Sequence, residues 1–93
     1  MICVLSCNDD NEAKSGTILL SIKNECYAEV RLYNSSGKLI DFKDFDCQES
    51  EFLNFTVNHF GMLVFHVSNS SGKEIKKSVS ILSGKIIEET VSF

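Results

Sequence analysis

A five-residue motif that occurs twice constrains the fold of this chain more than any other feature. Asn-Ser-Ser-Gly-Lys occupies residues 34–38 and again residues 69–73, and a shorter Ser-Gly-Lys occupies residues 83–85. Gly adopts the positive φ angle that a tight turn requires, and Asn and Ser side chains bond their own backbone within such a bend. Since each copy lies between apolar-rich runs, the motif predicts turns between strands that fold back on one another. The turn residues are expected to be Asn34, Gly37, Asn69, Gly72 and Gly84.

The runs between these turns alternate apolar and polar residues, which is typical of strands with one buried and one solvated face. In residues 27–33, for example, Val30 and Leu32 are predicted to face inward and Glu29 to face outward. Residues 62–67 are apolar on both faces and are predicted to form a central strand. The expected strands cover residues 17–23, 27–33, 38–42, 52–57, 62–67, 75–82 and 86–93, and no helix is expected.

About seven short strands with regularly spaced turns predict an all-β fold, a small antiparallel β-sandwich of the immunoglobulin-like kind. The predicted core includes Val30, Leu32, Ile40, Phe55, Phe65 and Val79. Ile40 and Phe42 are expected on the same face of their strand. Charges such as Lys76, Lys77, Glu88 and Glu89 are expected to protect the sheet edges.

The N-terminal region changes abruptly from apolar to acidic at a cysteine. The run Val4-Leu5-Ser6-Cys7 resembles a bacterial lipobox, and the following Asn8-Asp9-Asp10 is similar to the export signal of Bacteroidetes surface lipoproteins. Residues 8–16 are polar and without periodicity, and they are expected to form a flexible tether to the sandwich at 17–93. The lipobox resemblance implies a truncated signal at residues 1–7. It also implies a lipid on Cys7, a start codon further upstream, and a location at the outer membrane or cell surface. The alternative is an apolar N-terminal tag without processing.

A second resemblance is carried by the turns and the strands beside them. Residues 30–40 are similar to the opening of the C-terminal (type IX) sorting domains of Bacteroidetes, in which a strand ending in Tyr-Asn precedes a Gly-Lys turn. Residues 60–67 and 72–79 are similar to the later segments of those domains, although Leu63 stands where the family usually has Tyr. The resemblance implies an immunoglobulin-like sandwich of Bacteroidetes type, and a sorting role is kept as an alternative.

Four cysteines lead to a disulfide prediction. If Cys3 leaves with the signal and Cys7 is acylated, Cys26 and Cys47 remain as a pair in an exported protein. Oxidising compartments favour disulfides between such pairs. A Cys26–Cys47 disulfide is therefore expected, and two unpaired thiols are the alternative.

Other chemistry has little support in the sequence. His59 and His66 have no neighbouring ligands that would complete a metal site, and His66 is expected on the wetter face of its strand. The acidic stretch at residues 41–51 lacks calcium-loop spacing and is interpreted as a solvated loop. No phosphate-binding loop or nucleophile elbow is present, so no catalytic residue, metal or cofactor is expected. A net charge of −4 argues against nucleic acid as a partner.

These observations predict a non-enzymatic lipoprotein that faces the cell surface or periplasm. Its sandwich is expected to be a binding or structural module, held at the membrane by its lipid anchor, with a protein or a glycan as a further partner. Two alternatives remain, a secretion-sorting domain and a small inhibitor or immunity-type lipoprotein. For the inhibitor, the acidic residues 41–51 are the candidate surface.

Overall fold

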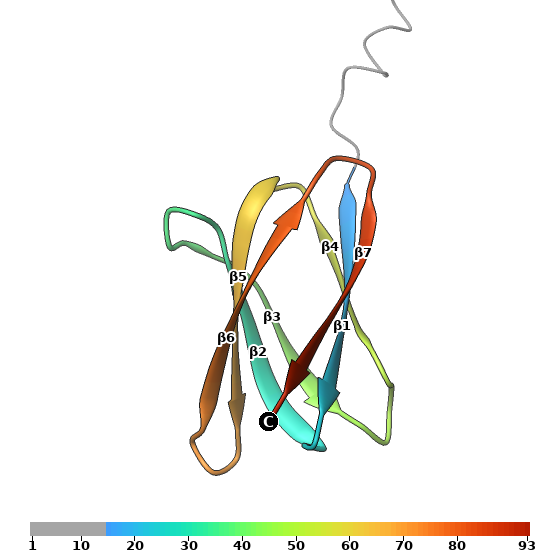
Figure 1. Cartoon of the computed structure of the whole chain (residues 1–93), viewed down its shortest axis with the longest axis vertical. Coiled ribbons are helices and arrows are strands. Elements are labelled where there is room, and N and C mark those ends of the chain that lie inside the picture. The colour runs from blue at the N-terminus through green and yellow to red at the C-terminus, as the bar shows by residue number, and fades with distance from the viewer. Residues whose placement is uncertain (1–14) are drawn as a thin grey trace, which may run out of the picture.

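The computed structural model describes residues 15–93, which form seven strands and no helix (Figure 1). The strands are β1 (Gly16–Lys23), β2 (Tyr27–Tyr33), β3 (Leu39–Asp46), β4 (Leu53–Val57), β5 (Gly61–Asn69), β6 (Glu74–Ile81) and β7 (Ile86–Ser92). They confirm the predicted all-β sandwich. Residues 1–14 lie outside the described part of the chain, and with them the predicted signal, Cys7 and most of the predicted tether.

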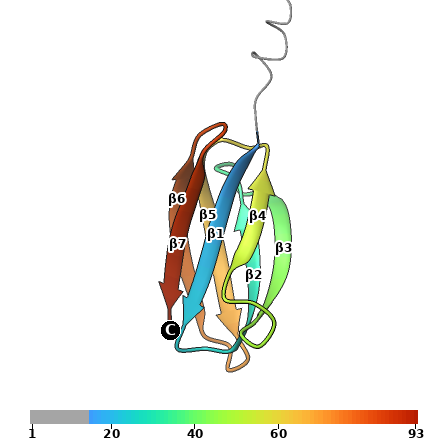
Figure 2. The same ribbon diagram turned by 90° about the vertical axis from the view of Figure 1, so that its right-hand side faces the viewer.

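The strands form two sheets that pack face to face (Figure 2). One sheet has the order β4-β1-β7 and the other has the order β3-β2-β5-β6. All neighbouring strands are antiparallel except β1 and β7, which are parallel. The sandwich is therefore mostly antiparallel, as predicted, with one parallel pair. Each connection reverses the chain, so the first and seventh strands run in the same direction and can pair only in parallel.

The two copies of the repeated motif form the same turn. In the first copy, the Gly37 amide donates to the Asn34 carbonyl at 3.0 Å, and Asn34 Oδ1 accepts bonds from the Ser36 and Lys38 amides at 3.0 and 2.9 Å. The second copy reproduces these bonds at Asn69 and Gly72. Gly37 and Gly72 both have a φ angle of 87°, which confirms these predicted turns.

The third turn has a different role. Gly84 has a φ angle of 76°, and the Lys85 amide donates to the Leu82 carbonyl at 3.1 Å. The turn joins β6 in one sheet to β7 in the other, so it is a crossover between sheets and not a hairpin. The prediction of a turn at Gly84 is confirmed.

A β-bulge early in β3 changes which residues face the core. Tyr33 pairs with Leu39 and Leu32 pairs with Asp41, which leaves Ile40 as the additional residue. Ile40 packs against the core, and Phe42 lies on the opposite, outer face with 42% of its surface exposed. The expectation that these two side chains share a face was wrong, because a bulge shifts the alternation by one residue.

The core lies between the inner faces of both sheets. Phe55 of β4 and Phe65 of β5 are fully buried, and their rings meet edge to face with centroids 5.0 Å apart. The predicted burial of Val30, Leu32 and Val79 is also confirmed, whereas Ile40 is half-buried. Phe45 is a further buried residue, which the interpretation of residues 41–51 as a loop had missed. The predicted central strand is β5, between β2 and β6.

Inward-pointing charges close both open sides of the sandwich. Lys77 Nζ of β6 lies 3.5 Å from Glu89 Oε1 of β7, so an ion pair joins the two sheets on one side. On the other side, Lys43 Nζ of β3 lies 5.7 Å from the centroid of the Phe55 ring. Charges that point inward from an edge strand are a known protection against unwanted strand pairing. Two of the predicted protective residues, Lys77 and Glu89, thus take part.

Candidate binding groove

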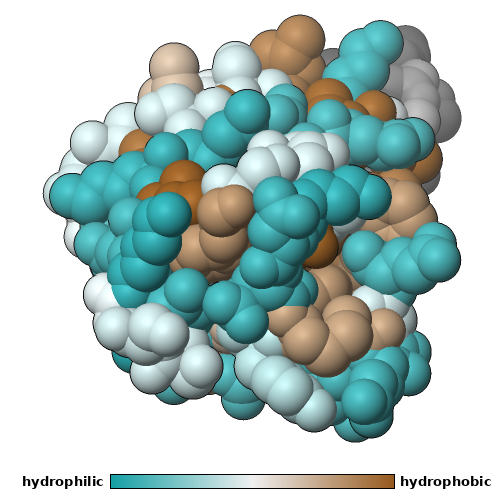
Figure 3. All heavy atoms as spheres, turned by 60° about the horizontal axis from the view of Figure 1, so that its bottom comes forward, coloured by the Kyte–Doolittle hydropathy of each residue, from teal (hydrophilic) through white to brown (hydrophobic). Residues whose placement is uncertain are grey.

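A groove of about 540 Å³ lies on the outer face of the four-stranded sheet, at one end of the sandwich. Its walls come from β2, β3, β5 and the turns that follow β3 and β5. The lining residues are Tyr27, Ala28, Glu29, Asp44, Phe45, Asp46, Glu49, Ser68, Asn69 and Ser70. Figure 3 brings this end of the molecule forward and shows hydrophobic areas surrounded by hydrophilic residues. We refer to this feature as the acidic groove.

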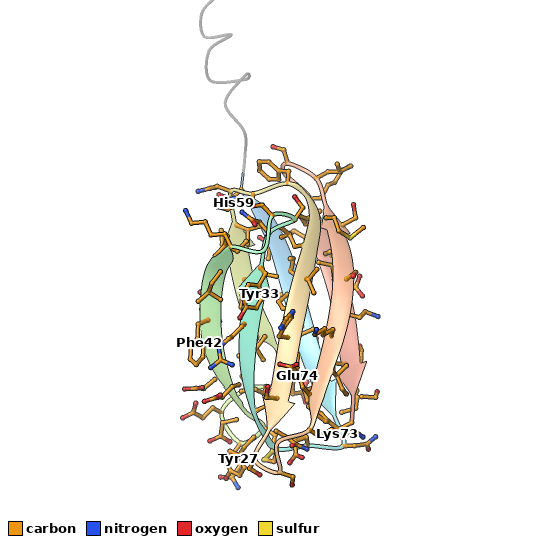
Figure 4. All side chains as sticks on the ribbon, turned by 90° about the vertical axis from the view of Figure 1, so that its left-hand side faces the viewer. Tyr27, Tyr33, Phe42, His59, Lys73 and Glu74 are labelled. Carbon is orange, nitrogen blue, oxygen red and sulfur yellow. A yellow bond between two sulfur atoms is a disulfide. The ribbon has the colours of Figure 1, made fainter. Side chains whose placement is uncertain are left out.

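The cross-strand register brings the polar side chains of the groove together. Glu29 of β2 stands opposite Asp44 of β3 on one side and Ser68 of β5 on the other. Tyr27 of β2 stands opposite Asp46 of β3, two residues along each strand from the Glu29–Asp44 pair. Because side chains two residues apart on a strand share a face, all of these groups lie on the outer side of the sheet. Tyr27 is 52% exposed and is labelled at this end in Figure 4.

The charge of the groove is only partly compensated. Arg31 Nη2 lies 3.6 Å from Glu29 Oε1. No ion pair found within residues 15–93 involves Asp44, Asp46 or Glu49. Asp46 Oδ1 accepts a bond from the Gln48 amide at 2.9 Å, which orders the turn after β3 but leaves the carboxylate charge in place. The groove is therefore negative and suits a cationic group.

The rim of the groove is fixed by a disulfide and by a hydrogen bond between loops. Cys26 and Cys47 are joined with their Cα atoms 4.8 Å apart, as the sequence predicted, and the Cys47 amide donates to the Cys26 carbonyl at 2.9 Å. Asn69 Nδ2 donates to Glu25 Oε2 at 3.0 Å, which ties the turn after β5 to the connection after β1. These links hold three chain segments together at one end of the sandwich.

The same two sulfurs lie close to a carboxylate. Ligand atoms of Cys26, Asp46 and Cys47 are within 4.8 Å of one another, which is the one such group of potential metal ligands found in residues 15–93. Thiolates are the form of cysteine that binds metals. Because the Cys26 and Cys47 sulfurs form a disulfide, neither is available as a thiolate ligand in this structure.

Beside the groove, the outer face carries a row of aromatic and cationic side chains. The Arg31 guanidinium lies 5.2 Å from the centroid of the Phe42 ring, and the Tyr33 and His66 rings are 4.5 Å apart (Figure 4). His66 Nδ1 lies 3.8 Å from Glu74 Oε2. His66 is thus on the outer face, as predicted, and its neighbours are Tyr33 and Glu74. His59 lies at the opposite end of the molecule.

Sequence reasoning identified part of this site. It singled out residues 41–51, of which Asp44, Asp46 and Glu49 line the groove, and it placed Glu29 on an outward face. It did not identify Tyr27 as a groove residue, although the alternation of residues 27–33 already directs this side chain outward. The groove also needs β5 beside β2, a pairing that no local pattern specifies.

Two comparisons with known proteins give no match to this chain. No protein-family model matches the sequence, and none of the curated proteins matches it. Among residues 15–93, no helix has the length and apolar character needed to cross a bilayer. The resemblance to Bacteroidetes lipoproteins and sorting domains therefore stays a prediction.

Proposed function

We propose that this chain is a non-enzymatic, lipid-anchored binding module that presents the acidic groove to a partner. The observation that carries the proposal is the groove itself, which has an exposed tyrosine and three carboxylates without ion-pair partners within residues 15–93. Exposed aromatic rings and charged groups in a concave site are typical of recognition surfaces. The uncompensated carboxylates favour a partner with basic groups.

The position of the first residue of the sandwich supports a groove that faces away from the anchor. Ser15 lies beside Asn58, with a hydrogen bond of 2.9 Å from Ser15 Oγ to Asn58 Oδ1, at the end of the sandwich opposite the groove. β1 leads from there toward the groove end, and its eight residues span about 27 Å at roughly 3.4 Å per residue. An anchor on Cys7 would thus attach at the end of the sandwich that lies away from the groove.

The groove can be tested with defined probes. We expect a Lys/Arg decapeptide to shift the backbone amide resonances of Glu29, Asp44 and Asn69, and an Asp/Glu decapeptide to leave them unchanged. The double variant Asp44→Asn/Glu49→Gln should weaken binding of the basic peptide. Glu88→Gln, an exposed strand residue on the other sheet, is the matched control and should bind like the wild type. Equal shifts over both sheets would contradict a role for the groove.

The anchor requires a separate test. Expression in a bacterial host from DNA that includes the region upstream of Met1, followed by mass spectrometry of the membrane fraction, should reveal acylated Cys7. The Cys7→Ser variant should leave the membrane fraction. Unmodified Cys7 in the wild-type chain would contradict the anchor without affecting the groove.

An inhibitor or immunity-type function is the second candidate. It is favoured by the position of Asp44, Asp46 and Glu49, which come from the acidic stretch and line the same groove. A basic toxin or hydrolase would be the partner in that case. Inhibition of an enzyme encoded beside this protein, lost in Asp44→Asn/Glu49→Gln, would distinguish it from a module that binds without inhibiting. Export of a carrier protein fused to this chain would instead support the sorting alternative.

A further inference from the structure

The four edge strands of the sandwich are not equally protected. β3, β6 and β7 each carry charged residues, among them Lys43, Lys77 and Glu89, which point inward. β4, the fourth edge, is Leu53-Asn54-Phe55-Thr56-Val57 and has no charge, no proline and an unbroken register with β1. Charges, prolines and bulges are the devices that keep edge strands from pairing with other chains. Of the features that protect edge strands, β4 has only a short length.

The backbone groups that face the open edge can be assigned from the hydrogen bonds of β1. The Thr17 amide donates to the Lys85 carbonyl at 2.9 Å, and the Lys23 carbonyl accepts from Phe93 at 3.0 Å, so odd-numbered residues of β1 direct their backbone groups toward β7. Even-numbered residues, such as Ile18, therefore face β4, because these groups alternate along a strand.

Ile18 stands opposite Phe55, so the backbone groups of Phe55 are used inside the sheet. Those of its neighbours Asn54 and Thr56 point away from β1. β4 is the end strand of the three-stranded sheet (Figure 2), so no other strand described in residues 15–93 is hydrogen-bonded to its outer edge. Such a row of edge-facing N–H and C=O groups can form hydrogen bonds with the backbone of another extended chain.

We propose that this edge pairs with the β4 edge of a second copy of the chain, antiparallel about a twofold axis at Phe55. This register sets Asn54 of one copy opposite Thr56 of the other, and the two such pairs can exchange four backbone hydrogen bonds. The side chains of Asn54 and Thr56 are exposed, uncharged and able to hydrogen-bond, so they are compatible across the axis. The two three-stranded sheets would become one continuous sheet.

The second copy is favoured as the occupant because its β4 is an edge that brings no charge to this one. Pairing β4 with β3, β6 or β7 of another copy would place charged residues against it. The twofold arrangement uses both β4 edges, so association should stop at the dimer. Since each copy carries a net charge of −4, added salt should strengthen the dimer by screening repulsion. This inference is independent of the acidic groove.

Sedimentation equilibrium of the full chain tests the proposal, with Cys3→Ser and Cys7→Ser included to exclude intermolecular disulfides. We expect the mass to rise with concentration from 10.4 kDa toward twice that value, and to rise further at higher salt. Thr56→Lys should weaken association by about tenfold or more, because it adds a charge to the edge. Ser80→Lys, an exposed position on the edge strand β6, is the matched control and should associate like the wild type.

Two further measurements keep the test decisive. Thr56→Pro removes an edge-facing N–H without removing a bond to β1, so it should prevent dimerisation while circular dichroism stays unchanged. Hydrogen exchange at the Asn54 and Thr56 amides should slow as protein concentration rises. A chain that stays monomeric at millimolar concentration in 0.5 M salt would overturn the proposal. Dimerisation that survives Thr56→Lys, or edge amides already protected in the monomer, would also overturn it.

Discussion

Single residues determine the shape of the two repeated turns. In each copy an Asn side-chain oxygen accepts two backbone amides, and a Gly three residues later takes a positive φ angle. The same five residues produce the same hydrogen bonds in hairpins that join different strand pairs. The local sequence therefore specifies these turns, and the surrounding fold has little influence on them.

Replacing Gly37 by Ala is expected to lower the free energy of unfolding by about 1–2 kcal/mol, because a Cβ atom disfavours a positive φ angle. No atom outside the neighbouring residues lies within 4 Å of that Cβ position, so the cost is conformational and not steric. Ser35→Ala in the same turn is the control and should change stability by less than about 0.5 kcal/mol. Urea unfolding that finds equal stability for both variants would contradict this account.

Gly16 is a different case, and the sequence alone assigned it to the tether. The residue begins β1 and is buried, and a Cβ atom there would lie 2.6 Å from Ile81 Cγ1. Gly16→Ala should therefore destabilise the protein by about 1–3 kcal/mol through overpacking. A tether residue would tolerate the change, so an unchanged urea midpoint would contradict close packing at this position.

At the scale of elements, an ion pair between the edge strands β6 and β7 links the two sheets. Lys77 and Glu89 are both partly exposed, so their ion pair contributes less than about 1 kcal/mol. Glu89→Lys should lower stability more at low salt than at 1 M salt, because it places two cations together and salt screens their repulsion. Glu88→Lys, on the outer face of the same strand, is the control. Equal salt dependence in both variants would exclude a specific pair.

The disulfide joins the residue before β2 to the residue after β3, at one end of a strand pair that the sheet ladder already holds together. Cys26 and Cys47 are 21 residues apart in sequence, so their link restricts the unfolded chain. Loss of the bond in Cys26→Ser/Cys47→Ser should lower the free energy of unfolding by about 3 kcal/mol. Denaturant unfolding of the oxidised wild type and this double variant measures the difference. Identical midpoints, or two titratable thiols in the unreduced wild type after export, would contradict this prediction.

At the scale of the whole molecule, stability depends on one core between two thin sheets. Phe65 contributes to it from the central strand β5, and its ring packs on Phe55 of the opposite sheet. Phe65→Ala should cost about 3–5 kcal/mol, which approaches the whole stability of a small domain. Phe42→Ala is an aromatic control on the outer face and should cost clearly less. Similar costs in thermal unfolding would place Phe42 in the core and contradict the bulge at Ile40.

The sequence by itself determined the features that arise between neighbouring residues. Alternation identified the inward faces of β2, β4 and β6, because the side-chain period of a strand is fixed by its backbone. The repeated Asn-Ser-Ser-Gly-Lys motif and the shorter Ser-Gly-Lys identified the turns, since few residues accept the backbone angles involved. The two cysteines expected in the exported domain indicated the disulfide, although the sequence left their distance open.

Only the tertiary structure decided the features that depend on distant segments. The bulge that turns Phe42 outward follows from the pairing of β3 with β2, and the close contact at Gly16 follows from the position of Ile81. The parallel pairing of β7 with β1 and the placement of β5 beside β2 join segments far apart in the chain. The acidic groove and the uncharged β4 edge exist only after these pairings form. Local patterns specify which face of a strand is buried, but packing of the complete core selects the neighbours.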